Sequence, residues 1–156
     1  LYAGIMIKNG KPYVLEYNVR MGDPECQPIM MRLNSDFYPY LLASSEGRLN
    51  DLPAISWKDE YAVCVVLASK GYPESYPKGD IITGFENIPA NSFVFQAGTK
   101  KQDGNILSNG GRVLGVTALG LTLQVAIDNA YLACKKLDWK NKYHRNDIGK
   151  KGLSYL

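Results

Sequence analysis

The chain has 156 residues, a formal net charge of +3 at pH 7, 46% hydrophobic residues and 21% charged residues. This composition is typical of globular proteins and excludes the disordered and collagen-like classes. No apolar run approaches the roughly 18 residues that indicate a membrane span, and no secretory signal is visible. The length is sufficient for one domain, or for a small domain plus a fragment of another.

The distribution of charged residues and cysteines limits the kinds of binding site that the sequence predicts. The basic residues are scattered except in a C-terminal cluster, residues 135–151, which we interpret as a solvated surface. A nucleic-acid site is not expected, because no basic stripe is interleaved with aromatic residues. Cys26, Cys64 and Cys134 are odd in number and form no CxxC pair, and the chain has one histidine. We therefore expect neither zinc nor disulfides, and a cytoplasmic location.

The first fifty residues predict a hairpin followed by two short helices. Residues 2–8 and 13–19 are β-rich runs around Asn9-Gly10, a pair that tolerates positive φ and is a strong hairpin signal. A short helix is expected from Pro28. A second helix is expected from a Ser35 cap to about Ser45, and Gly47 would end it.

A boundary follows at residues 46–56, a stretch of Gly, Pro and polar residues, and the pattern then becomes β-rich. Strands are expected at residues 61–69, 92–100 and 112–120, with turns at 103–104 and 109–111. Residues 121–137 predict an amphipathic helix that Thr122 caps.

The stretch EYNVRMGDPE, residues 16–25, carries the clearest chemistry. Glu16, Asn18 and Arg20 lie two residues apart, so their side chains share one face of an extended strand. Carboxylate and amide oxygens suit Mg²⁺, which also takes phosphates and water as ligands. A guanidinium suits a phosphate or acyl phosphate. Asp23 and Glu25 follow on a tight turn, where they could orient Arg20 or a second substrate.

Two alternatives remain open on spacing alone. Glu16 and Arg20 could form a surface ion pair on an exposed hairpin. In SNGGRVLG, residues 108–115, Arg112 and backbone amides could meet a phosphate, or the glycines could simply form a hairpin turn.

Several segments resemble the glycinamide ribonucleotide synthetase (phosphoribosylamine–glycine ligase) family. Residues 1–33, which include EYNVRMGDPE, resemble the end of its ATP-grasp domain. Four further segments resemble its C-terminal domain: KGDIITG, AGTKKQDG, NGGRVLGVTALG and AYLACKKLDW. The resemblance implies that residues 1–50 belong to the ATP-grasp domain and residues 51–156 to the C-terminal domain. The implied fold is α+β: an antiparallel hairpin and helices, then a small β-rich, barrel-like domain with one long helix.

The same resemblance implies a function and roles for the residues of the first domain. The family joins glycine to 5-phosphoribosylamine through a glycyl phosphate, consuming ATP, and forms glycinamide ribonucleotide for purine biosynthesis. Glu16 and Asn18 correspond to its metal ligands for Mg²⁺ or Mn²⁺. Arg20 corresponds to a catalytic and nucleotide-binding residue near the transferring phosphoryl group, and Asp23 is a further catalytic candidate.

Some family features are absent from the sequence. Gln96 stands where the family often has His, and the strand LYAGIMI carries no acidic ligand. The chain has no glycine-rich phosphate loop and no doubly wound N-terminal domain, so we expect those parts to precede Leu1 and to be its partner. Alone, the chain is expected to be inactive. The alternative is a non-catalytic, β-rich interaction module.

Overall fold

A computed structural model describes residues 2–155. The strands are β1 (Tyr2–Lys8), β2 (Lys11–Asn18), β3 (Tyr61–Ser69), β4 (Ile81–Ile82), β5 (Ser92–Gln96), β6 (Thr99–Gln102), β7 (Asn105–Ser108), β8 (Arg112–Gly120) and β9 (Lys142–Tyr143). The α-helices are α1 (Cys26–Arg32), α2 (Tyr38–Ser45) and α3 (Leu123–Lys136). Short 3-10 helices cover Leu49–Asp51, Phe85–Asn87 and Lys150–Tyr155.

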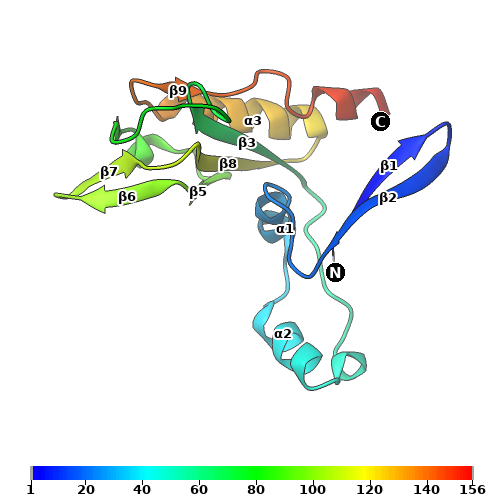
Figure 1. The fold of residues 1–156 in the computed structure, drawn as a ribbon. Helices are drawn as coiled ribbons and strands as arrows, with labels where there is room; N and C mark the ends of the chain where they lie inside the picture. Colours follow the sequence, from blue (N-terminus) through cyan, green and yellow to red (C-terminus); the bar gives the residue numbers. More distant parts are fainter. Residues whose placement is uncertain (1, 156) are drawn as a thin grey trace.

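The strands form three separate antiparallel sheets. The largest has the order β5-β8-β3-β9, a second has the order β4-β7-β6, and β1 and β2 form a hairpin (Figure 1). The predicted α+β class is confirmed, but the barrel-like shape is wrong, because the sheets are open. The edge strands β5 and β9 of the largest sheet do not pair with each other, and sheet closure requires such pairing.

The core lies between the largest sheet and α3. In the register of β3 on β8, Val63, Val65 and Leu67 face the same side and pair with Ala118, Val116 and Leu114. These side chains pack with the buried stripe of α3, which consists of Ala126, Ile127, Ala130, Ala133 and Cys134. Continuous apolar strands are buried on both faces, and the second face here contacts α1 (Figure 1).

Helix α1 fits closely on that second face. Cys64 pairs with Thr117, and Val66 pairs with Gly115. A Cβ atom on Gly115 would lie 3.6 Å from Cγ of Gln27 in α1, at ordinary van der Waals distance, so the helix lies directly against this face of the sheet. The segment that follows the hairpin is thereby held against the sheet of the second half of the chain.

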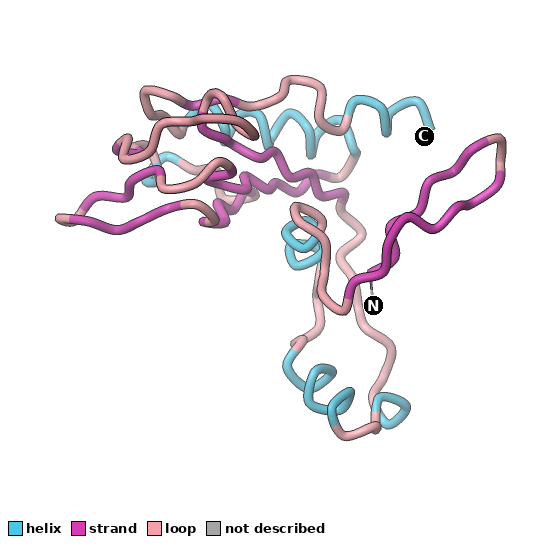
Figure 2. Tube along the Cα trace, viewed as in Figure 1, coloured by secondary structure: helices cyan, strands magenta, loops and turns pink. Residues whose placement is uncertain are grey.

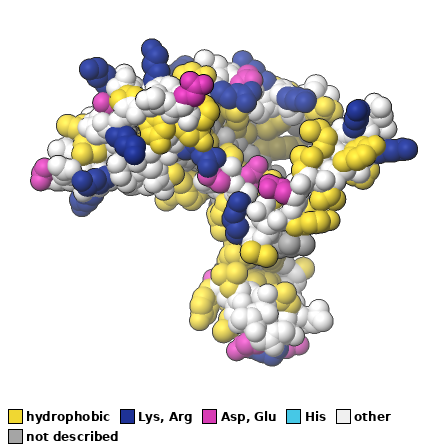
Figure 3. Space-filling view, viewed as in Figure 1, with side chains coloured by type: hydrophobic (Ala, Val, Ile, Leu, Met, Phe, Trp, Pro, Cys, Tyr) yellow, Lys and Arg dark blue, Asp and Glu magenta, His cyan; other side chains and the backbone are white. Residues whose placement is uncertain are grey.

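The hairpin projects away from this body (Figure 2). Asn9 and Gly10 both have positive φ, 51° and 73°, as the Asn-Gly signal predicts. Apolar side chains are exposed along both strands, including Ile5, Ile7 and Leu15 (Figure 3). Exposed apolar surface of this extent is typical of a segment that packs on another part of a protein.

The helix predictions are confirmed in outline, but α1 begins at Cys26 and not at Pro28, and one predicted cap is wrong. Thr122 Oγ1 accepts a hydrogen bond from the Val125 amide at 3.2 Å, as predicted for α3. The expected Ser35 cap of α2 is wrong: the Ser35 hydroxyl instead accepts from the Ser56 amide at 2.8 Å. The carboxylate of Asp36 accepts from the Tyr38 amide at the start of α2. A long-range partner therefore removed Ser35 from the local cap.

Two segments between the start of β5 and the start of β8 differ from the structure that the sequence predicts. Residues 92–100 form two strands, β5 and β6, in different sheets, and the chain breaks direction at Ala97-Gly98. The hairpin-turn interpretation of residues 109–111 is wrong, because β7 and β8, which flank them, lie in different sheets and do not pair. A Cβ on Gly98 would come within 2.7 Å of Gly110 Cα, which shows that glycine is required there by close backbone approach.

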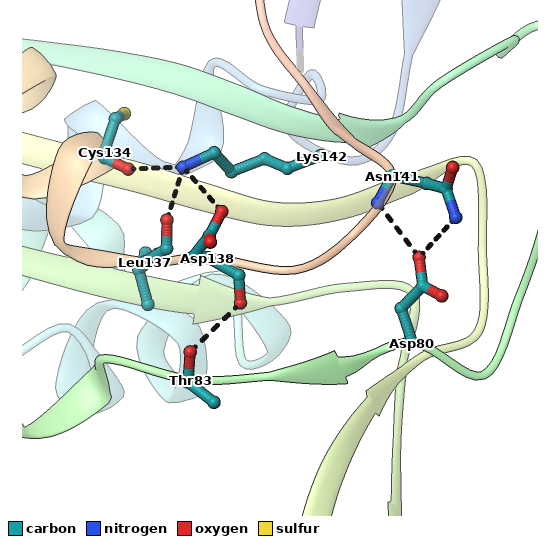
Figure 4. Close-up of polar contacts among 7 residues, drawn as sticks. All are labelled: Asp80, Thr83, Cys134, Leu137, Asp138, Asn141 and Lys142. Atoms are coloured by element: carbon teal, nitrogen blue, oxygen red, sulfur yellow. Dashed lines mark hydrogen bonds and ion pairs between the residues drawn. The ribbon is translucent and has the colours of Figure 1, made fainter.

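Lys142 fixes the C-terminal end of α3 (Figure 4). Its ammonium group donates to the carbonyl oxygens of Leu137 at 2.5 Å and Cys134 at 3.4 Å, and lies 3.6 Å from Asp138. The last carbonyls of a helix have no partner within the helix, and a cation there also opposes the negative end of the helix dipole. Lys142 thus joins β9 to α3.

We expect Lys142→Met to lower the free energy of unfolding by about 1–3 kcal/mol, because charged hydrogen bonds to partly buried carbonyls are lost. Urea unfolding followed by circular dichroism measures this change. Lys140→Met is the matched control, since Lys140 is exposed and is expected to change stability by less than about 0.5 kcal/mol. Equal effects of the two substitutions would show that Lys142 has no capping role.

Candidate functional site

A cavity of about 510 Å³ lies where the base of the hairpin meets the start of β8. Acidic and basic side chains gather in this region of the surface (Figure 3). The lining residues come from β1, β2, the loop after β2 and β8: Tyr2, Glu16, Arg20, Met21, Gly22, Asp23, Glu25 and Arg112. Three carboxylates and two guanidinium groups thus face a small polar cavity.

Strand β2 positions Glu16 through an irregular pairing with β1. Gly4 pairs with Glu16 and Ile5 pairs with Val14, so Leu15 is an extra residue on β2. A bulge of this kind redirects the side chains that flank it. A Cβ on Gly4 would lie 3.0 Å from Cγ of Glu16, so the Glu16 side chain passes close over the glycine of the neighbouring strand.

The structure brings three of the four predicted site residues together. Glu16, Arg20 and Asp23 line the cavity, whereas Asn18 does not. The amide nitrogen of Asn18 is buried and has no hydrogen-bond partner among residues 2–155. All four predicted site residues lie on one short segment of the chain, but the structure places only three of them in the cavity lining.

The alternative of a surface ion pair between Glu16 and Arg20 is not seen. Within the described part of the chain these two side chains form no ion pair. Nη1 of Arg20 instead donates to the Met21 carbonyl at 2.9 Å. The Glu16 carboxylate is thus not neutralised by the arginine of its own strand segment.

Asp23 pairs with a residue of the second half of the chain. Oδ2 of Asp23 lies 2.9 Å from Nη2 of Arg112, and both side chains are about half exposed. A phosphate-binding role for Arg112 was one of two open alternatives, because nothing in its local spacing indicates that SNGGRVLG reaches the EYNVRMGDPE segment. The only local signal for a role of Arg112 in the site was the pair of glycines that precedes it.

The loop after β2 is tightly packed at Gly22. A Cβ there would lie 2.3 Å from Oε2 of Glu25 and 3.1 Å from Cζ of Tyr2. A side chain at position 22 would displace the Glu25 carboxylate from this position. The negative charge of Glu25 raises the pKa of the Tyr2 hydroxyl, with a smaller contribution from Glu16, so the hydroxyl stays protonated and can donate a hydrogen bond in the cavity.

We expect Glu25→Gln to lower the pKa of Tyr2, because the substitution removes the largest cause of the upward shift. Titration of the tyrosine ¹³Cζ resonances by NMR between pH 8 and 12 measures it. Glu86→Gln, on an exposed residue of a 3-10 helix outside the cavity, is the control and should leave the Tyr2 titration unchanged. A Tyr2 titration that does not move in Glu25→Gln contradicts the assigned cause.

The residues present fit a divalent cation that also binds phosphate. Among residues 2–155 no group of three or more His, Cys, Asp or Glu side chains could hold a metal by itself. Glu16 offers one carboxylate, and the buried side-chain nitrogen of Asn18 has no hydrogen-bond partner in the part of the chain that the structure describes. Rotation of an amide by 180° exchanges its oxygen and nitrogen, so Asn18 can also present an oxygen. Mg²⁺ accepts such a small protein ligand set when phosphate and water complete it.

Gln96 lies outside this cavity. Its side-chain oxygen accepts a hydrogen bond from the Thr99 hydroxyl at 2.9 Å. It thereby joins the end of β5 to the start of β6. This local contact stabilises the turn between the two sheets.

Comparisons with known families match two separate segments of the chain. The family described as "Phosphoribosylglycinamide synthetase, C domain" matches residues 62–151. The description "Phosphoribosylglycinamide synthetase, ATP-grasp (A) domain" matches residues 1–26. The predicted division between residues 50 and 51 stays a prediction.

Individual relatives agree with the family match. The chain is 45% identical over 155 residues to a phosphoribosylamine–glycine ligase of Rhodopirellula baltica, covering 98% of this chain and 36% of that protein. It is 48% identical over 148 residues to the ligase of the same name from Rhizobium meliloti, covering 95% and 35%. A crystal structure of phosphoribosylamine–glycine ligase from Thermotoga maritima superposes with a TM-score of 0.78 at 38% identity, over 93% of this chain and 35% of that one.

The chain therefore spans about a third of the length of the relatives it matches. A family match over more than half of the chain, together with a shared fold, decides its membership. This chain belongs to the phosphoribosylglycinamide synthetase family, and it carries sequence of both the ATP-grasp domain and the C domain.

Proposed function

We propose that the chain is about a third of an ATP-dependent ligase that joins glycine to 5-phosphoribosylamine and produces glycinamide ribonucleotide, ADP and phosphate. The observation that supports this most is the cavity itself. It combines Glu16, Arg20 and Asp23 from the ATP-grasp segment with Arg112 from the C domain. Metal ions held by carboxylates and guanidinium groups both stabilise the negative charge of a transferring phosphoryl group.

In the proposed reaction, a carboxylate oxygen of glycine attacks the γ-phosphorus of ATP, and ADP leaves. The amine nitrogen of phosphoribosylamine then attacks the carbonyl carbon of the glycyl phosphate, and phosphate leaves. Arg20 faces the cavity with N–H groups beyond the one bound to Met21. It stabilises negative charge on the moving phosphoryl group, because a guanidinium fork matches phosphate oxygens.

Glu16 and Asn18 would hold Mg²⁺ or Mn²⁺ in this proposal. The metal would neutralise charge on the nucleotide phosphates. Glu16 is suited to this because no cation of residues 2–155 forms an ion pair with it. Asp23 contributes by orienting Arg112 across the cavity.

The remainder of the ligase is the proposed partner of the exposed hairpin. Apolar residues on β1 and β2 face outward, and the ligases that match are about three times longer than this chain. Covering the hairpin would complete the nucleotide side of the cavity. We also propose a cytoplasmic location, which fits the three free cysteines. In residues 2–155, no helix is long and apolar enough to cross a membrane.

The experiment compares the complete gene product with the 156-residue chain. We expect the complete protein to release phosphate from ATP only when glycine and phosphoribosylamine are both present, and the isolated chain to release none. A coupled assay for ADP, which is formed together with the phosphate, measures the turnover of both proteins. Turnover by the isolated chain would contradict its role as a partial site. A complete protein without glycine-dependent turnover would favour the interaction-module alternative.

A further inference from the structure

We propose that Arg112 is the C domain's binding residue for the oxyanion of one of the two substrates that are joined, the carboxylate of glycine or the phosphate of phosphoribosylamine. This inference rests on the proposed function and assigns a role to a residue outside the ATP-grasp segment. Both substrate groups are planar or tetrahedral oxyanions, and a guanidinium binds either through paired N–H groups.

The first support is the position of Arg112. It is the first residue of β8, and its side chain lines the same cavity as Glu16 and Arg20. It is the only lining residue that the C domain supplies among the described residues. The guanidinium therefore faces the same cavity as the ATP-grasp residues.

The second support is the rigid placement of its backbone. The Arg112 carbonyl accepts a hydrogen bond from the Gly98 amide at 3.0 Å. A Cβ on Gly98 would come within 2.5 Å of that carbonyl oxygen and 2.7 Å of Gly110 Cα. The Ser69 hydroxyl and amide donate to the carbonyls of Gly110 and Gly111 at 3.0 and 2.8 Å. Two other segments, around Gly98 and Ser69, thus hold residues 110–112, from which the Arg112 side chain extends.

The third support is that the ion pair with Asp23 leaves donors unused. One nitrogen, Nη2, contacts Asp23. The guanidinium donates no hydrogen bond to any other group in residues 2–155. A half-exposed ion pair contributes little to stability by itself. The close-packed glycines are therefore better explained by a need to aim the arginine than by the pair alone.

Asp23 acts as the positioning residue for Arg112. A carboxylate that contacts one edge of a guanidinium fixes its orientation and leaves the other N–H groups for a second oxyanion. With three carboxylates lining the cavity, an anionic substrate needs both arginines to offset repulsion. Arg20 serves the nucleotide side, and Arg112 serves the substrate that enters from the C domain.

The test measures steady-state kinetics of the complete ligase with Arg112→Met and Arg112→Lys. We expect Arg112→Met to raise the KM for one joined substrate by about 10- to 100-fold, with the KM for ATP changed less than twofold. Arg112→Lys should recover part of the loss, because it keeps the charge without the fork. An increase confined to glycine assigns the carboxylate, and one confined to phosphoribosylamine assigns the phosphate.

Arg145→Met is the matched control, because Arg145 forms an exposed ion pair with Asp147 at 2.6 Å outside the cavity. It should leave all three KM values unchanged. Combining Asp23→Asn with Arg112→Met separates substrate binding from a purely structural pair. If Arg112 only steadies Asp23, Arg112→Met has no further effect on KM in the Asp23→Asn background, and the proposal is overturned.

A binding measurement separates this inference from the proposed function. Calorimetric titration of the complete protein with glycine and with ribose 5-phosphate needs no turnover. Weaker binding of one probe to Arg112→Met supports the inference even if the ligase assay fails. Equal affinities of the wild-type and Arg112→Met proteins for both probes, with unchanged unfolding midpoints, overturn the inference while leaving the ligase activity to its own test.

Discussion

Glu16→Gln in the complete ligase is expected to lower kcat by about 100-fold or more and to raise the Mg²⁺ concentration needed for half-maximal activity. The substitution keeps the size of the side chain and removes its charge. Glu16 lines the cavity and has no counter-ion among residues 2–155, so its charge is available to a cation. Losses of this size are typical when a group that stabilises transition-state charge is removed. Initial rates measured across a Mg²⁺ titration test this expectation.

Asn18 provides a graded companion to that experiment. Asn18→Ala should also lower activity, and Asn18→Asp should retain more of it, because aspartate still presents an oxygen ligand. Glu86→Gln, on an exposed residue outside the cavity, is the control. Unchanged kinetics in the Glu16→Gln, Asn18→Ala double variant, with the fold intact, would remove metal binding from this strand and favour a non-catalytic module.

The largest stability effect is expected at the centre of the sheet–helix core. Leu67 is fully buried on β3 and pairs with Leu114. Leu67→Ala is expected to lower the free energy of unfolding by about 2–5 kcal/mol, through lost burial and the cavity that remains. This is a large fraction of the roughly 5–15 kcal/mol that stabilises a typical domain. Urea unfolding monitored by circular dichroism measures the change.

Leu121→Ala is the matched control for Leu67→Ala. Leu121 is 82% exposed just before α3, so the same truncation there should change stability by less than about 0.5 kcal/mol. Similar losses from the two substitutions would contradict the assignment of the core to the interface of α3 with β3 and β8.

Local sequence signals predicted the elements whose own residues decide their conformation. Asn9-Gly10 defined the hairpin, because few other residue pairs adopt positive φ twice in succession. Thr122 and the apolar stripe that follows it defined α3, since a cap and a 3.6-residue period are both local. The apolar runs of β3 and β8 were predicted with the bounds that the structure shows, residues 61–69 and 112–120.

Elements that depend on a distant partner were missed or misplaced. Strands β4 and β9 are two residues long and exist only through pairing with β7 and β3. The division of residues 92–100 into β5 and β6 follows from the close crossing of Gly98 with Gly110. Sheet closure was predicted wrongly for the same reason, because it depends on whether edge strands meet in space.

The sequence by itself determined the chemistry of one segment: Glu16, Asn18, Arg20 and Asp23 are close along the chain, so a strand and a turn suffice to bring them near each other. Only the tertiary structure decided that Arg112 joins them. Its contact with Asp23 requires α1 to dock on β3 and β8 and the glycine crossing to fix the start of β8. Such long-range packing is set by the whole core, and no local spacing encodes it.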